Sequence, residues 1–446
     1  MNVEQAKRNV QTLFGSSGRL RVVYLMKHTL TLLTALLEPS AQSRRLLTRR
    51  ETLMTVGAGV AAMLLPGSVR GQQDTRGGTD LGAVLSRMTL ADKVGQLLMA
   101  YLEPSTLEEK IVRFRCGSLL VWGNLKNVDA AGLCELANRA QALSLQHRKL
   151  PLWLHGYSPG LGHRMVWLGH AAKHSTPAKA EKAAEIFGRR WRAVGLHNLP
   201  EPTLNVPLYK TGIQMQWNTA SDPKTVREFG LAVVRGATRA RCGTMAQHFP
   251  AHGATPLDSH NAFPVLELDR QTLMRDHLEM YRECFQAGCT TICTAHLACP
   301  ALDPDPKHIA STSRPILTDF LRGELGFQGV TIADAIGMKG FQKNGSAEDM
   351  SVDAVIAGCD SICITNGGTE LLGKVFDRLM KAAESQRLTP QRLDEAVLRN
   401  LKFTEWLGLL GTDARVSPGR ARELLSDERD NRFLAGIVGH EDDRGD

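Results

Sequence analysis

The chain has 446 residues, of which 43% are hydrophobic and 22% charged. This composition is typical of a soluble globular protein with a large core, and it shows no lipid-facing bias. Residues 1–50 hold nine Lys or Arg and two Glu, so +7 of the formal net charge of +8 belongs to this segment. Because the remaining chain has no basic stripe with interleaved aromatics, we expect no nucleic-acid partner.

The basic N-terminal segment has the features of an export signal. Arg49 and Arg50 form a twin-arginine pair, residues 56–65 are apolar and rich in Ala and Gly, and a small-residue exit follows. We therefore expect residues 1–75 to be a twin-arginine export signal and disordered leader, and the protein to be periplasmic or extracellular. A disordered basic leader is the alternative. A true start at Met26 would explain the long stretch before the arginine pair.

From Leu81 onward, short apolar runs alternate with amphipathic stretches, which is typical of repeated strand and helix units. Eight strands are predicted, at Val94–Tyr101, Ser118–Trp122, Leu152–Gly156, Gly195–Val206, Gly243–His248, Thr290–His296, Val330–Asp334 and Ser361–Thr365. Helices are predicted between them, at Ala178–Val194, Asp222–Ala240, Asp269–Ala287, Ser313–Leu325 and Gly368–Ser385.

Eight such units predict an α/β fold, an eight-stranded (β/α) TIM-type barrel that forms a single catalytic domain over residues 80–412. The alternative is an open doubly wound sheet, which carries a Gly-rich phosphate-binding loop after its first strand. Residues 102–105 contain no glycine, and this disfavours the alternative. Residues 413–446 are charged and are predicted to form a C-terminal helix and a frayed tail.

The nine cysteines are odd in number and most lie inside apolar runs. They are interpreted as small core residues rather than as a disulfide framework. No Cys-x-x-Cys spacing indicates zinc, and no Gly-rich loop indicates a phosphate-bearing cofactor. We therefore expect neither a metal ligand set nor a cofactor.

The first chemical signal is the triplet Asp258-Ser259-His260, which closes a polar segment that also contains His248 and His252. A His held by a nearby carboxylate can donate and recover a proton near neutral pH, as the hydrolysis of a polar bond requires. A polar loop rich in turn-forming residues is the alternative interpretation.

The second signal is Asp334, a single acid in an apolar run that otherwise reads as a buried strand. An unpaired buried carboxylate is costly, so this side chain is expected at the open end of the strand or in a pair. Catalytic side chains of parallel barrels lie at the carboxyl ends of the strands. A helix cap is the weaker alternative, because the flanking residues stay apolar.

Several motifs occur together and in order: His-Phe-Pro-Ala-His-Gly at 248–253, Asp258-Ser259-His260, Thr294-Ala295-His296, Pro300-Ala301-Leu302-Asp303, and Leu325-Gly326-Phe327 leading to Asp334. With these motifs the chain resembles glycoside hydrolase family 3, in particular its single-domain β-N-acetylhexosaminidase branch. The likeness extends over residues 85–410.

The resemblance implies a retaining glycosidase that removes a terminal β-linked, N-acetylglucosamine-type sugar from a cell-wall fragment or oligosaccharide. Asp334 stands at the position of the nucleophile and His260 at that of the acid/base, with Asp258 orienting His260. A donor on a loop can move to let water reach the sugar, while a nucleophile on a strand stays fixed.

We place the sugar-binding positions at His248, Gln247, Trp217, Tyr157 and Met338. Three of them depart from the family pattern: Tyr157 begins the stretch that is usually Asp-Gln-Glu-Gly-Gly, Trp217 replaces an Arg, and Gln247 replaces a Lys. Each lost charged hydrogen bond weakens sugar binding by about 1.5–3 kcal/mol.

Two interpretations follow from these departures. The chain is either a hydrolase with a rebuilt sugar pocket, in which Tyr157 and Trp217 stack on the sugar, or an exported sugar-binding pseudoenzyme that has lost turnover. Retention of Asp334, Asp258 and His260 favours the hydrolase. A cofactor-dependent barrel enzyme is disfavoured, because no cofactor-binding motif is found.

Overall fold

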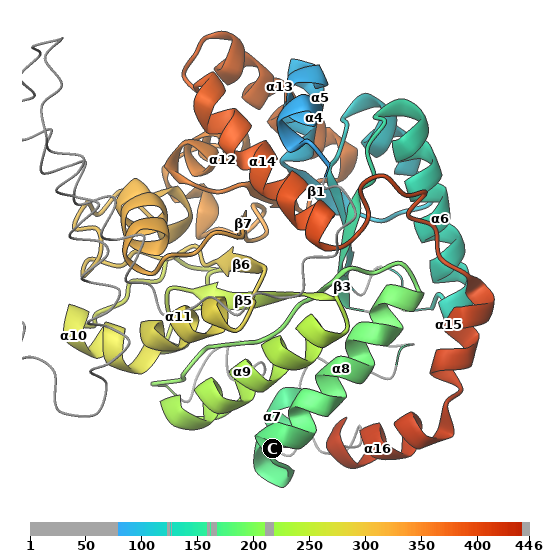
Figure 1. Ribbon diagram of the computed structural model, residues 1–446. Coiled ribbons are helices and arrows are strands. Elements are labelled where there is room, and N and C mark those ends of the chain that lie inside the picture. The colour runs from blue at the N-terminus through green and yellow to red at the C-terminus, as the bar shows by residue number, and fades with distance from the viewer. Residues whose placement is uncertain are drawn as a thin grey trace, which may run out of the picture. The chain divides into compact units, whose positions relative to one another are not determined.

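A computed structural model of the protein describes residues 79–122, 125, 127–157, 161, 167–209 and 218–438. Its centre is a closed barrel of eight parallel strands in chain order, with β8 pairing back onto β1. Figure 1 shows helices such as α9, α11 and α14 around the strands. This confirms the predicted TIM-type fold. The strands are β1 Leu98–Tyr101, β2 Ser118–Trp122, β3 Trp153–Tyr157, β4 Asn198–Leu199, β5 Gly243–Phe249, β6 Thr291–Thr294, β7 Val330–Ala333 and β8 Ser361–Ile364.

Helices alternate with the strands and cover the outside of the barrel. Many start at a capping residue followed by proline; for example, the Asp222 side chain accepts a 2.8 Å hydrogen bond from Thr225 N at the start of α9. The α-helices are α4 Leu81–Arg87, α5 Leu90–Gln96, α6 Ala130–His147, α7 Trp167–His174, α8 Pro177–Ala193, α9 Pro223–Arg239, α10 Arg270–Leu273, α11 Glu279–Gln286, α12 Ala347–Ala357, α13 Gly368–Glu384, α14 Pro390–Trp406, α15 Pro418–Leu425 and α16 Glu428–Val438. Short π-helices occur at η1 Glu109–Arg113, η5 Met274–Leu278 and η7 Pro315–Glu324. Short 3₁₀-helices occur at η4 His252–Ala254, η6 Ala310–Thr312 and η8 Phe341–Asn344.

The barrel interior is filled by inward-facing side chains of alternate strand residues. Trp153 of β3 packs edge-on against Phe403 of α14, with ring centroids 5.1 Å apart, and closes the interior at one end. On β7, Val330 and Ile332 belong to this inner cluster, whereas Ala333 belongs to the outer core under the helices. Since strand side chains alternate, Asp334 continues the inward-facing series at the carboxyl end.

Two strand predictions were too long by at least four residues. Residues 94–96 belong to α5, because Thr89 and Asp92 form a capping box that starts a helix there, and a short apolar run does not distinguish helix from strand. The predicted strand at 195–206 is reduced to the two residues of β4. Pro200 and Pro202 follow, and proline has no N–H to donate to a neighbouring strand.

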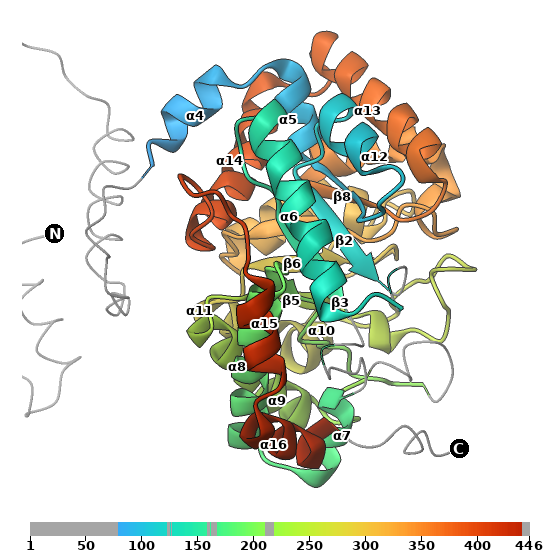
Figure 2. The ribbon, with the colours of Figure 1, turned by 90° about the vertical axis from the view of Figure 1, so that its right-hand side faces the viewer.

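The chain after the barrel forms two short helices, α15 and α16, where one final helix was expected. Figure 2 shows α15 beside α6 and α16 beside α7, so the chain returns to helices of the first half. No helix in the described part of the chain has both the length and the apolar character needed to cross a membrane. The predicted export signal and residues 439–446 of the predicted tail lie outside the described residues.

Candidate active site

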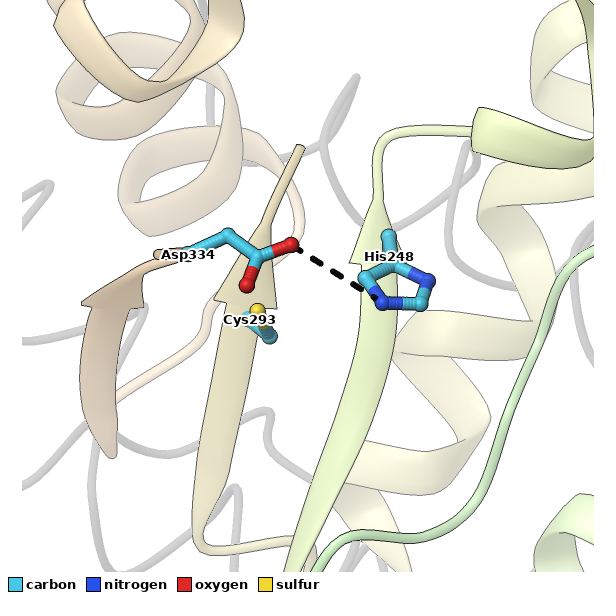
Figure 3. A group of neighbouring side chains, drawn as sticks. All are labelled: His248, Cys293 and Asp334. Carbon is cyan, nitrogen blue, oxygen red and sulfur yellow. Dashed lines mark ion pairs between the residues drawn. The ribbon is translucent and has the colours of Figure 1, made fainter. Parts of the chain in front are cut away.

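Asp334 lies directly after β7, at the carboxyl end of the barrel, where it faces His248 of β5 (Figure 3). His248 Nε2 is 3.9 Å from Asp334 Oδ2, and Asp334 Oδ1 accepts a 2.7 Å hydrogen bond from Ala335 N. Burial on its own raises the pKa of Asp334, but His248 and His296, together with the Ala335 N–H, more than offset this and hold the pKa below its ordinary value. The carboxylate is therefore ionised at neutral pH, as a nucleophile must be.

The orientation of His248 depends on an irregularity in β5. The register of β5 against β6 shifts between Ala246 and Phe249, so the regular alternation is broken there. Phe249 packs outward against Tyr281, with ring centroids 5.3 Å apart, and His248 points toward Asp334 (Figure 3).

Asn205, which follows β4, holds both the backbone and the ring of His248. Its Oδ1 accepts a 3.1 Å hydrogen bond from His248 N, so its Nδ2 faces the ring nitrogen Nδ1, 3.1 Å away. Because that amide nitrogen can only donate, the neutral ring carries its hydrogen on Nε2, which is directed at Asp334. Burial lowers the pKa of His248 more than the Asp334 charge raises it, and this keeps the ring neutral.

The Asp258-Ser259-His260 triplet forms the expected dyad on the loop after β5. Asp258 Oδ1 accepts two hydrogen bonds from His260, one from the backbone N at 2.9 Å and one from Nδ1 at 2.7 Å. Nε2 is thereby left as the ring atom that can exchange a proton with a ligand. The His260 side chain is 47% exposed, as access to a substrate requires, and its charge contributes to the lowered pKa of Asp334.

The loop that carries the dyad is bonded to the segment that follows Asp334. Gly340 N donates to Ser259 O at 2.9 Å, and Lys339 N donates to His260 O at 3.3 Å. Below the dyad, Ser259 Oγ lies 2.8 Å from His252 Nε2 and 3.7 Å from the sulfur of the buried Met338. The His252 ring is buried and shapes the loop, and burial lowers its pKa to about 4.

Of the remaining predicted sugar-binding positions, Gln247 is bonded inside the protein and Tyr157 contacts an aromatic ring. The Gln247 side chain is buried, and its Nε2 donates to Pro200 O at 2.9 Å and to Thr203 Oγ1 at 3.3 Å. Both amide hydrogens are thus used inside the protein. Tyr157 ends β3, and its ring meets Trp122 at the end of β2 with centroids 6.3 Å apart. Trp217 lies outside the described residues.

Four residues of this region were not among the predicted site residues. Asn205 holds His248, and Cys293 of β6 lies beside Asp334 (Figure 3). His296 Nε2 donates to Ala335 O at 3.3 Å and supports the turn after Asp334. Glu201 is buried after β4, where Thr203 N donates to its Oε2 at 3.0 Å. Asn205 could have been found from the sequence, because it is a polar residue between the apolar Leu204 and Val206 at the end of a predicted strand.

Known proteins resemble this chain over most of the barrel. The Glycosyl hydrolase family 3 N terminal domain matches residues 89–403. The chain is 28% identical over 331 residues to "Beta-hexosaminidase A" of Pseudoalteromonas piscicida, covering 67% of this chain and 55% of the relative. It is also 28% identical over 255 residues to "Beta-hexosaminidase" of Methylobacillus flagellatus, covering 57% of this chain and 65% of the relative. The chain thus spans between one half and two thirds of the length of these relatives.

Among solved structures, the protein is similar to a glycoside hydrolase family 3 beta-N-acetylglucosaminidase from Paenibacillus sp. str. FPU-7. The TM-score is 0.67 at 28% sequence identity, and the match covers 78% of this chain and 69% of that chain. The family match extends over most of the barrel, from α5 to α14, and includes Asp334 and the dyad. The chain therefore belongs to glycosyl hydrolase family 3.

Proposed function

We propose that the protein is a retaining glycoside hydrolase that removes a terminal β-linked N-acetylglucosamine-type sugar. The observation that carries this proposal is the pairing of an ionised, inward-facing Asp334 with an exposed His260 that is hydrogen-bonded to Asp258. A fixed carboxylate and a separate proton donor are the two groups that a two-step displacement at an anomeric carbon requires.

In the first step, Asp334 attacks the anomeric carbon while His260 Nε2 protonates the leaving oxygen, giving a glycosyl-enzyme intermediate. In the second step, the same nitrogen takes a proton from water, and the water oxygen displaces Asp334 from the sugar. The Asp258 carboxylate stabilises the imidazolium form of His260 across the 2.7 Å hydrogen bond. His248 directs its Nε2 hydrogen toward Asp334 across 3.9 Å.

The sugar class rests on the relatives, whose names specify hexosaminidase and N-acetylglucosaminidase. The sugar contacts proposed for this chain are His248, Tyr157, Trp217, Met338 and Oε1 of Gln247. An aromatic ring can stack on the apolar face of a sugar ring, which suits the replacement of charged family positions by Tyr157 and Trp217.

The test is a screen of the purified full chain against aryl β-N-acetylglucosaminide, β-glucoside and β-xyloside, with Asp334→Asn beside it. Asp305→Asn is the matched control, because this exposed acid lies on the neighbouring loop after β6. We expect release of the aryl group from the N-acetylglucosaminide, its loss in Asp334→Asn and its retention in the control. Absence of turnover on every glycoside, with sugar binding preserved, would favour the pseudoenzyme.

We also propose export by the twin-arginine route, supported by the Arg49-Arg50 pair and the apolar stretch after it. Residues 1–75 fused to a folded reporter should carry it across the inner membrane of a bacterium with a functional twin-arginine translocase. Replacing both arginines by lysine should keep the reporter in the cytoplasm. Export of the lysine variant at the original rate would contradict this route.

A further inference from the structure

Three strands of the barrel bring a nitrogen, a sulfur and an oxygen donor together. His248 on β5, Cys293 on β6 and Asp334 after β7 each offer one ligand atom, and these atoms lie within 4.8 Å of one another (Figure 3). No metal ligand set was expected from the sequence, because it contains no Cys-x-x-Cys spacing. The three residues are far apart in the chain and meet only because β5, β6 and β7 are neighbours.

We infer that His248, Cys293 and Asp334 form a binding site for Zn²⁺, with water as the fourth ligand. Imidazole, thiolate and carboxylate are the three ligand types that zinc accepts, and three protein ligands with one open position is a known zinc arrangement. Cys293 is the selective element, because a sulfur ligand favours Zn²⁺ over Mg²⁺ and Ca²⁺.

The distances suit such a site after a small contraction. Donors of a tetrahedral zinc site lie about 3.3–3.7 Å apart, given bonds of about 2.1 Å to nitrogen or oxygen and about 2.3 Å to sulfur. His248 Nε2 and Asp334 Oδ2 are already 3.9 Å apart. The widest separation of up to 4.8 Å has to shorten by roughly 1 Å, which side-chain rotation can supply.

The site is open to solvent on one side and closed on the other. The His248 and Asp334 side chains are 14% and 20% exposed, so an ion can reach them, whereas Cys293 is buried beneath. Zinc binds the thiolate, so the Cys293 thiol has to release its proton to solvent on binding.

The hydrogen bonds between Asn205 and His248 oppose metal binding. Asn205 donates to Nδ1 of His248, so the ring hydrogen lies on Nε2, which is the atom that would bind zinc. Binding moves this hydrogen to Nδ1, where it needs an acceptor such as the Asn205 carbonyl oxygen. That oxygen already accepts from His248 N, so the amide has to rearrange. A carboxylate at position 205 would accept both hydrogens, as in carboxylate–histidine–zinc triads.

One consequence rests on the proposed function. Zinc would occupy the candidate nucleophile, so zinc and a terminal sugar should exclude each other, and Zn²⁺ should inhibit turnover competitively. The direct test of the site does not use turnover, so a failure of the metal site is distinguishable from a failure of the proposed hydrolase activity.

The experiment is a titration of the full chain with Co²⁺, a spectroscopic substitute for Zn²⁺, followed by near-ultraviolet absorption. We expect a sulfur-to-cobalt charge-transfer band that Zn²⁺ removes, that is absent in Cys293→Ser and that persists in Cys289→Ser. Cys289 is the matched control, because it is also buried, lies just before β6 and bonds to Thr244 O and Thr291 O instead. Absence of the band in the wild type, or its persistence in Cys293→Ser, would overturn the inference.

Calorimetric titration with Zn²⁺ supplies a second, independent measurement. Asn205→Asp should bind Zn²⁺ about ten-fold more tightly, and His248→Gln should weaken binding at least ten-fold while leaving the thiol in place. Far-ultraviolet circular dichroism confirms that each variant is folded. Unchanged Zn²⁺ affinity in both variants would also overturn the inference.

Discussion

Replacement of Asp258 by Asn separates the charge of the dyad from its geometry. Asp258 Oδ1 accepts both hydrogen bonds from His260, at 2.9 and 2.7 Å, and the Oδ1 of Asn can accept the same two. Asp258→Asn therefore removes the negative charge and keeps the ring orientation, whereas Asp258→Ala removes both. A hydrogen bond to a charged group contributes about 1.5–3 kcal/mol and a neutral one about 0.5–1.5 kcal/mol.

Loss of the charge should therefore cost Asp258→Asn about 1–1.5 kcal/mol of transition-state stabilisation, or a roughly 5- to 13-fold lower kcat/KM. The lower end is expected, because the His260 side chain is 47% exposed and water screens the charge. Asp258→Ala should lose about 1.5–3 kcal/mol, or roughly 10- to 150-fold.

The assay compares an N-acetylglucosamine disaccharide with a nitrophenyl N-acetylglucosaminide. Both variants should be impaired mainly on the disaccharide, because its leaving oxygen is basic and needs the proton. Wild-type kcat/KM for Asp258→Asn on the disaccharide would refute the role of the charge. Equal losses on both substrates would refute proton donation by His260.

Two further predictions concern buried groups whose pKa is displaced. Burial raises the pKa of Glu201 to about 8, so the stability present below pH 4.5 is lost as the pH rises through 8. The Gln side chain in Glu201→Gln can still accept the hydrogen bond from Thr203 N. This variant should raise the free energy of unfolding at pH 9 by up to about 5 kcal/mol and change it little at pH 4.5. Equal effects at both pH values in urea unfolding would contradict this. Within the described residues both ring nitrogens of buried His277 lack a hydrogen-bond partner, and burial lowers its pKa to about 4, so stability is lost as the pH falls from 6.5 toward 4. His277→Leu should therefore stabilise the protein more at pH 5 than at pH 7 by thermal unfolding, and a larger gain at pH 7 would refute the assignment.

The fold could be predicted from the sequence because most strands and several helices have a local signal. Strand runs such as Ser118–Trp122 are apolar and short, and helices such as α9 begin at a capping residue followed by proline. The inward-facing position of Asp334 follows from the alternation that Val330 and Ile332 establish. The Asp258–His260 pair could be predicted because residues two apart in a turn can bond to each other.

The surroundings of Gln247 and His248 could not be predicted, because they depend on the register shift in β5. Regular alternation after Met245 would turn Gln247 toward the barrel and His248 away, whereas the shift sends His248 toward Asp334. The partners of Gln247, Pro200 O and Thr203 Oγ1, come from a segment more than forty positions earlier. Cys293 was interpreted as a small core residue, and it is buried. Its position beside His248 and Asp334 was not predicted.

The bonds from Lys339 and Gly340 to the carbonyls of His260 and Ser259 have a consequence for protein engineering. Two crossover loops of the barrel form one joint scaffold, so neither can be exchanged between homologues without the other. A chimera that receives a foreign loop at 250–262 but keeps its own 335–342 has to reproduce both backbone bonds, or His260 will be displaced from its position beside Asp258. Loops grafted into this barrel should therefore be exchanged as a pair, residues 250–262 together with residues 335–342.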